Sequence, residues 1–199
     1  MPIDRWEACL AGSGGQGIIS AGIILAEAAV LAGLNAVQTQ SYGPESRGGA
    51  SRAEVVLSDG EIDYAKTTRP DVLLAMTADA CAKYAAKTKA DGLLIVDDQV
   101  ETIPAGPYRV IRAPITRIAA ADLGRPIVAN IVALGVLAAL TEIVPLGVLE
   151  EAVLARVPKG TEELNRTALR RGFEVGRQTA PPAQAPANDS SRTSTIGVP

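Results

Sequence analysis

Residues 10–17 read Leu10-Ala11-Gly12-Ser13-Gly14-Gly15-Gln16-Gly17, and an apolar run from Ile18 to Leu25 follows at once. An apolar segment, a glycine-rich turn and helix-periodic apolar residues form the strand–turn–helix order that opens a βαβ unit. The glycines have the spacing G-x-G-x-x-G, which permits a tight turn, close approach of backbone to a ligand, and close packing of helix on strand. The stretch therefore predicts an α/β fold.

The ligand of this glycine turn stays open at the level of the residues. A dinucleotide site needs an acidic residue at the end of the second strand, about 20 residues on, and the second predicted strand, residues 35–41, has no carboxylate. The free N–H groups at the start of the following helix favour an anion. Three interpretations remain: a dinucleotide, a phosphate or acyl-carrier ligand, and glycines present only for the turn and its packing.

Composition favours a single domain whose core is built from small aliphatic side chains. The chain has 199 residues, of which 47% are hydrophobic and only 3% aromatic, and a chain of this length buries enough surface to fold as one unit. Small aliphatic residues suit parallel strands that helices cover on both faces. We expect a Rossmann-like, mainly parallel sheet with helices on both faces.

The order of elements also predicts one antiparallel hairpin in the otherwise parallel sheet. It predicts one boundary as well, between a folded domain and a C-terminal tail. Asp59-Gly60 is typical of a tight hairpin turn, so residues 62–64 are expected to return antiparallel to the strand at residues 51–58. Residues 1–178 are expected to form the α/β domain. Residues 179–199 are rich in Ala, Pro, Ser and Thr, which predicts a disordered tail.

Charge and residue usage exclude several classes of function. A formal net charge of -3 and a pI near 5.1 argue against a nucleic-acid groove. The residues before the first strand lack the apolar stretch of a secretory signal, and no apolar run is long enough to span a bilayer, so a soluble, cytoplasmic protein is expected. The chain has no histidine and two cysteines, which excludes Ser-His and Cys-His catalysis, imidazole metal sites and a cluster held by this chain alone.

A second glycine-rich stretch follows the second predicted strand and reads Ser41-Tyr42-Gly43-Pro44-Glu45-Ser46-Arg47-Gly48-Gly49. Loops at the carboxyl ends of strands in open α/β sheets are where such folds bind ligands. Arg47 can pair bidentately with a phosphate or with a carboxylate of a partner subunit. The alternative for Arg47 is an intrachain salt bridge to Glu45 or Glu54.

Two further polar positions have two interpretations each. Asn130 heads an apolar helix at residues 130–140, where it is either the N-cap or a buried amide that faces the site. Asp97 and Asp98 follow a buried strand. Paired carboxylates there can hold a metal or act as acid and base, or they form a solvated turn.

Both glycine-rich stretches, together with Ser58-Asp59-x-Glu61-Ile62 and Asn130-x-x-x-Leu134-Gly135, resemble the gamma subunit of the 2-oxoacid:ferredoxin oxidoreductases. The resemblance covers about Asp4 to Gln178, and the loop at residues 41–49 is its more specific motif. The related indolepyruvate enzymes usually carry a different sequence before Arg-Gly-Gly. The resemblance therefore favours the 2-oxoglutarate or branched-chain enzymes.

The resemblance implies a hetero-oligomer that decarboxylates a 2-oxoacid on thiamine diphosphate, passes electrons through iron–sulfur clusters to ferredoxin, and releases an acyl-CoA. This chain lacks the thiamine-binding Gly-Asp-Gly signature and has too few cysteines for a cluster. Thiamine diphosphate, magnesium and the clusters are therefore expected on alpha and beta subunits, with a delta subunit as a further candidate.

The role left for this chain is to close over the active site and help to hold coenzyme A as co-substrate, with no catalytic residue or metal ligand of its own. The residues expected to contact coenzyme A are Gly12, Ser13, Gly14, Gly15, Gln16, Gly17, Ser41, Tyr42, Gly43, Pro44, Glu45, Ser46, Arg47, Gly48, Gly49 and Asn130. Two other classes stay open, a stand-alone nucleotide-binding module and a structural subunit without a ligand. Pyruvate, ketoisovalerate and indolepyruvate stay open as alternatives to 2-oxoglutarate.

Overall fold

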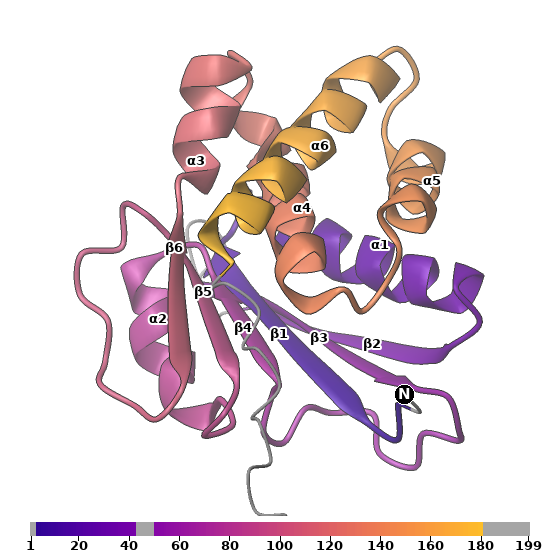
Figure 1. Cartoon of the computed structure of the whole chain (residues 1–199), viewed down its shortest axis with the longest axis vertical. Helices are drawn as coiled ribbons and strands as arrows, with labels where there is room; N and C mark the ends of the chain where they lie inside the picture. The colour runs from indigo at the N-terminus through magenta and orange to yellow at the C-terminus, as the bar shows by residue number, and fades with distance from the viewer. Residues whose placement is uncertain (1–2, 43–49, 181–199) are drawn as a thin grey trace, which may run out of the picture.

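The computed structural model describes residues 3–42 and 50–180, and Figure 1 shows a central sheet with helices packed on it. The sheet has six strands in the order β2-β3-β1-β4-β5-β6. Their bounds are β1 Trp6–Ser13, β2 Asn35–Tyr42, β3 Ala50–Ser58, β4 Val72–Ala75, β5 Leu93–Asp97 and β6 Arg109–Ala113. Each strand lies within a few residues of an apolar or alternating segment that predicts it.

One strand runs against the direction of the other five. β1 pairs in parallel with β4, β4 with β5, and β5 with β6. β3 pairs antiparallel with both β1 and β2, so β2 points the same way as β1 although β3 lies between them. The expectation of an α/β fold with a mainly parallel sheet is confirmed.

Helices cover both faces of the sheet, and most of them lie on one face (Figure 1). The alternation of β1 sends Ala8 and Leu10 into a core shared with α1, α4, α5 and α6, and Cys9 and Ala11 into a smaller core under α2. The larger helices are α1 Ile18–Leu31, α2 Ala78–Tyr84, α4 Ala129–Thr141, α5 Leu146–Arg156 and α6 Glu162–Thr179. Short helical turns fill the rest, at Ala85–Lys87, α3 Ile115–Arg117, Ile118–Asp122 and Pro126–Val128.

Helix α4 lies in the middle of the larger core. Its residues from Ala129 to Ala139 are all buried, as the apolar run predicts. Helix α6 packs on it at backbone distance: a Cβ on Gly172 would lie 2.0 Å from the carbonyl oxygen of Val132, and one on Gly135 would lie 2.1 Å from that of Leu169. Glycine is therefore required on both helices at this crossing.

The predicted returning strand at residues 62–64 is wrong. Residues 59–71 form no strand, and the antiparallel partner that follows β2 in sequence is β3. Both sides of β3 are already paired with β1 and β2, which leaves no edge for another strand. The backbone of the segment is held by side chains instead, because the Arg5 guanidinium donates to the carbonyl oxygens of Tyr64 and Lys66, both at 3.0 Å.

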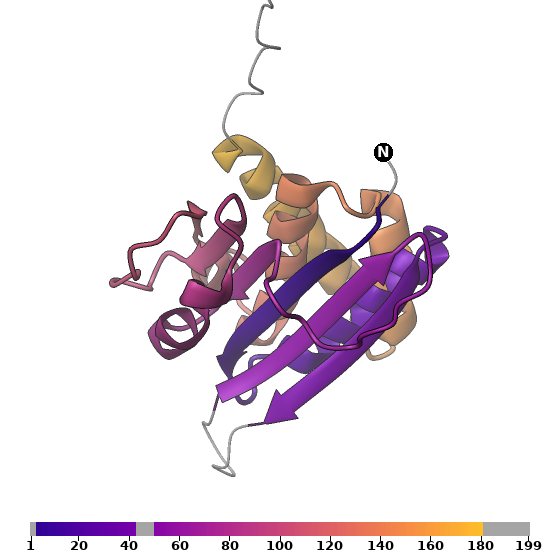
Figure 2. The ribbon, with the colours of Figure 1, turned by 90° about the horizontal axis from the view of Figure 1, so that it is seen from below.

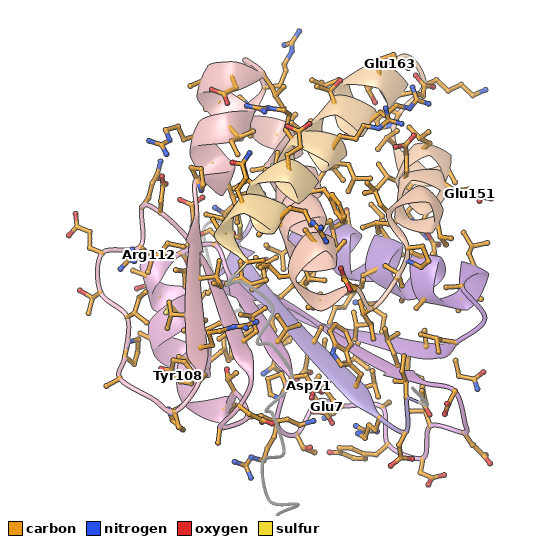
Figure 3. The ribbon with its side chains drawn as sticks, in the orientation of Figure 1. Glu7, Asp71, Tyr108, Arg112, Glu151 and Glu163 are labelled. Carbon is orange, nitrogen blue, oxygen red and sulfur yellow. The ribbon has the colours of Figure 1, made fainter. Side chains whose placement is uncertain are left out.

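The buried carboxylate of Glu7 also holds the segment between β3 and β4 in place. Glu7 is 2% exposed and accepts hydrogen bonds from the backbone amides of Thr68 and Arg69 at 2.8 and 2.9 Å and from Arg5 Nε at 2.7 Å. Its own amide donates to Asp71 at 2.8 Å, and Figure 3 shows these two acidic residues close together at the start of β1. Burial alone would raise the pKa of Glu7, but the hydrogen bonds from Arg5, Thr68 and Arg69 together hold that pKa below 4.5.

The expected tail, residues 179–199, falls outside the described residues from 181 onward, and helix α6 extends to Thr179. Within the described part of the chain, no helix combines the length and the apolar character that crossing a membrane requires.

Candidate functional site

The glycine turn and the two strand ends that flank residues 43–49 lie at one end of the sheet. β1 ends at Ser13 in the glycine turn, β2 ends at Tyr42, and β3 begins at Ala50. Ser51 of β3 lies opposite Gly12 of β1 on one side and opposite Tyr42 of β2 on the other. Figure 2 shows the heads of β1 and β2 beside the tail of β3. The pairing register therefore brings the glycine turn next to both ends of the second glycine-rich loop.

Of the second loop, residues 43–49 lie outside the described residues. The expected contacts of Gly43, Pro44, Glu45, Ser46, Arg47, Gly48 and Gly49, including the alternative salt bridges of Arg47, are therefore not described by the structure. Ser41 is exposed at the end of β2.

The glycine turn is closed by its own glutamine. Gln16 Oε1 accepts a hydrogen bond from the Ser13 amide at 2.7 Å, and the Gln16 amide donates to the Ser13 carbonyl oxygen at 3.2 Å. A Cβ on Gly12 would lie 2.4 Å from that Oε1 atom and 3.1 Å from Met76 Cβ. Gly14 and Gly15 are exposed, so they form the part of the turn that a ligand can reach, whereas Gln16 braces the turn from within.

Helix α1 begins at this turn without a side-chain cap. Gly17 is its N-cap, with φ of 73°, a left-handed conformation that favours glycine. Within residues 3–42 and 50–180, no protein group accepts a hydrogen bond from the amides of Ile18 or Ile19. These amides and the positive end of the helix dipole form a place where an anion is stabilised.

Asn130 faces the turn from helix α4. The helix begins at Ala129 and has Val128 at its N-cap position, so the N-cap interpretation of Asn130 is wrong. The side chain is buried and its Nδ2 donates to the Gly17 carbonyl oxygen at 3.2 Å. A Cβ on Gly17 would lie 2.6 Å from that nitrogen. Asn130 is thus the buried amide of the second interpretation, and it joins the first turns of α1 and α4.

A cavity of about 310 Å³ opens beside this junction. It is bordered by Gly17, Ser20 and Asn130 on the side of the turn, and by Ile127, Pro158 and Thr161 on the other. Ser20 is exposed in the first turn of α1. The residues after α5 come into this cavity only through tertiary packing, and no sequence signal marks them as neighbours of the glycine turn.

The acidic pair at the end of β5, Asp97 and Asp98, has a structural role. Asp97 is 1% exposed, and its carboxylate accepts hydrogen bonds from the amides of Gln99 at 3.0 Å and Thr116 at 2.7 Å. Asp98 pairs with Arg117 at 3.1 Å. The solvated-turn interpretation is therefore wrong for Asp97. Across residues 3–42 and 50–180, no group of three or more cysteine, aspartate or glutamate side chains is placed to hold a metal ion.

Comparison with known proteins identifies relatives over almost the whole domain. A family model described as pyruvate ferredoxin/flavodoxin oxidoreductase matches residues 7–175. The 2-oxoglutarate synthase subunit KorC of Methanocaldococcus jannaschii is 48% identical over 178 residues, which cover 87% of this chain and 95% of that protein.

Solved structures show the same relationship. The crystal structure of a keto/oxoacid ferredoxin oxidoreductase gamma subunit from Geobacter sulfurreducens has a TM-score of 0.81 and 50% identity, covering 88% of this chain and 98% of that one. A 2-oxoglutarate:ferredoxin oxidoreductase from Magnetococcus marinus, solved with 2-oxoglutarate, coenzyme A and succinyl-CoA bound, has a TM-score of 0.78 and 25% identity. The match covers 90% of this chain and 32% of that longer chain. The chain therefore belongs to the pyruvate ferredoxin/flavodoxin oxidoreductase family, and its resemblance to gamma subunits of 2-oxoacid:ferredoxin oxidoreductases is confirmed.

Proposed function

We propose that this chain is the gamma subunit of a 2-oxoglutarate:ferredoxin oxidoreductase, in which it helps to hold coenzyme A and to close the active site. The observation that carries the proposal is the uncapped start of α1, where the amides of Ile18 and Ile19 have no acceptor among the described residues. Coenzyme A brings phosphates, and a helix start with free amides is a fitting place for a phosphate.

Asn130 supports the same role through its contact with Gly17. Its amide group engages the Gly17 carbonyl oxygen at 3.2 Å, the same oxygen that accepts the first hydrogen bond of α1 from the Ala21 amide at 3.0 Å. The buried position of α4 fixes this amide. The turn is therefore organised before a ligand arrives, which lowers the entropic cost of binding.

The redox and thiamine chemistry belongs, in this proposal, to alpha and beta subunits and to a delta subunit where one is present, with ferredoxin reached through the complex. Cys9 and Cys81 are the cysteines of the chain, and both are buried. They do not fit an iron–sulfur cluster, which needs four ligands. 2-Oxoglutarate is proposed as the substrate because the relative at 48% identity is a 2-oxoglutarate synthase subunit.

Ser20 offers a test that separates ligand binding from folding. A glutamate there, in the first turn of α1, interacts favourably with the helix dipole and leaves the fold intact, but its charge repels a phosphate at the same helix end. In the assembled complex, Ser20→Glu should raise the Michaelis constant for coenzyme A at least about threefold, whereas the matched control Ser20→Ala should leave it unchanged. A complex with Ser20→Glu that assembles normally and keeps its coenzyme A constant would refute the coenzyme A role of this turn.

A further inference from the structure

A second cavity lies on the face of the sheet opposite α1. It has a volume of about 320 Å³ and is enclosed by β1, β3, the segment at residues 64–70 and the end of α2. Cys9 lies on its wall from β1 and Tyr84 from α2. The glycine turn does not border it, because Cys9 and Ala11 face this side of the sheet whereas α1 packs on the other.

The charged side chains around this cavity are mostly cationic. Arg52, Lys66 and Lys87 line it together with a single carboxylate, Glu54. Among residues 3–42 and 50–180, neither lysine forms an ion pair. The lining therefore carries two positive charges that no described protein group balances.

Glu54 is already engaged by other protein groups. It is 6% exposed, pairs with Arg52 at 3.3 Å, and accepts hydrogen bonds from the hydroxyls of Thr67 and of Thr39, the latter at 3.4 Å. A carboxylate with three such partners is satisfied. It balances Arg52 alone and leaves the lysines available.

Arg52 is oriented and still has an unused donor. Its guanidinium lies over the Tyr84 ring, 5.1 Å from the centroid, so the ring and Glu54 hold the guanidinium in place. Its Nε is buried, and no hydrogen-bond acceptor for it exists within the described residues. A buried N–H without an acceptor costs free energy, and a ligand oxygen in the cavity would remove that cost.

Cys9 lines the cavity beside these cationic side chains and carries no charge. Its side chain is 4% exposed, and burial raises the pKa of the thiol to about 12. The thiol stays protonated at neutral pH, so it places no negative charge beside an incoming anion.

We propose that this cavity is a binding site for a phosphate group, held by the Arg52 guanidinium and the ammonium groups of Lys66 and Lys87, and separate from the glycine turn. A phosphate at neutral pH carries between one and two negative charges. Its charge therefore balances the two positive charges of Lys66 and Lys87 more fully than a ligand with a single carboxylate would. The phosphate comes either from a free small anion or from a phosphorylated cofactor such as coenzyme A.

Calorimetric titration of the full chain with inorganic phosphate tests the site, with ionic strength held constant by sodium chloride. Lys87→Gln and Lys66→Gln should each weaken phosphate binding about tenfold or more, because each removes a charge-assisted contact. Arg52→Lys keeps the positive charge but loses the paired N–H donors of the guanidinium, so it should also weaken phosphate binding. Lys83→Gln is the matched control, since Lys83 lies 5.4 Å from the same Tyr84 ring but does not line the cavity.

The proposal fails if the unmodified chain shows no saturable phosphate binding, or if Lys87→Gln and Lys83→Gln bind phosphate equally well. A second titration with coenzyme A and with dephospho-coenzyme A, each in competition with phosphate, separates the sources. If coenzyme A competes with phosphate and dephospho-coenzyme A does not, the site binds the ribose phosphate of the cofactor. Phosphate binding unaffected by either compound assigns it to a free anion.

Discussion

Glu7 is a charged residue on a strand whose neighbours are apolar, and its burial is explained by the segment that crosses above it. Four donors converge on its carboxylate: Arg5 Nε, the amides of Thr68 and Arg69, and the Thr68 hydroxyl. These contacts fix a stretch without regular structure to the sheet. Glu7 thus supplies hydrogen-bond acceptors to the backbone of residues 64–70 that a neighbouring strand would otherwise supply.

Glu7→Gln should destabilise the fold by about 1–3 kcal/mol at neutral pH, because an amide nitrogen would face donors that need an acceptor. The pKa of Glu7 lies below 4.5 in the folded chain, so its contribution is complete above that pH and is lost as the pH falls through the lowered pKa. The gap in the free energy of unfolding between the two proteins should therefore stay constant at neutral pH and narrow once the pH falls below 4.5 toward the lowered pKa.

Urea unfolding at a series of pH values measures that gap. Glu151→Gln is the control, because Glu151 is exposed on α5 (Figure 3) and its curve should stay parallel to that of the unmodified chain. A gap for Glu7→Gln that closes while the pH is still above 4.5 would contradict the assignment of a lowered pKa to this carboxylate.

Asn130 illustrates how far the sequence can place a site residue. The sequence predicts a polar side chain at the head of an apolar helix, and both an N-cap and a buried amide satisfy that pattern. As an N-cap, Asn130 would place the first helical residue at Ile131, whereas the helix begins two residues earlier, at Ala129. Helix ends are uncertain by one or two residues from pattern alone, so only the three-dimensional contact with Gly17 decides between them.

At the scale of elements, the close crossing of α4 and α6 depends on residues without side chains. Gly135, Gly172 and Gly176 let the two backbones touch, and each would place a Cβ less than 3.0 Å from backbone of the other helix. The carbonyl groups they meet belong to intact helices and cannot move independently. The crossing is therefore sensitive to a single methyl group.

Gly172→Ala should lower the free energy of unfolding by about 2–3 kcal/mol, because the added methyl group forces α6 away from α4. Gly147→Ala is the matched control: it makes the same change in helix α5 at a position with open space around it, and better helix propensity should raise the free energy by up to about 1 kcal/mol. Thermal unfolding of both variants measures the contrast. Equal effects of the two substitutions would show that the crossing tolerates a methyl group.

Most elements follow from local pattern, and the exception shows what local pattern lacks. Gly33, with φ of 89°, follows the end of α1 in the left-handed conformation that glycine favours after a helix, and the buried strands match continuous apolar runs. The returning strand after Asp59-Gly60 is absent because β3 has no free edge. The residues of a turn predict the conformation of that turn. Whether a strand follows depends on which strand edges in the sheet are still unpaired.

At the scale of the whole molecule, the two cavities could not be predicted. The cavity of about 310 Å³ joins α1, the start of α4 and the residues after α5, and the cavity of about 320 Å³ joins β1, β3 and α2. Each combines segments far apart in the chain. The glycine turn lies beside the strand ends that flank residues 43–49 because β1 and β2 run in the same direction with β3 paired between them.

The isolated chain should show no oxidation of a 2-oxoacid, because it lacks a thiamine-binding signature and has two buried cysteines. Purified alone with 2-oxoglutarate, coenzyme A, thiamine diphosphate and an electron acceptor, it should produce no acyl-CoA above the buffer rate. Addition of the partner subunits should restore production. Thiamine-dependent turnover by the lone chain would overturn the division of roles between subunits.

Figure 2 shows the start of β1 and the end of α6 on the same side of the molecule, away from the heads of β1 and β2. A covalent linker at either of these two positions therefore leaves the end of the sheet that carries the glycine turn unobstructed. This arrangement makes gene fusion sterically simple, and the match to the longer Magnetococcus chain covers about a third of that chain. The same domain can therefore be built either as a separate subunit or as part of a fused chain, because a linker at either position lies away from the glycine turn.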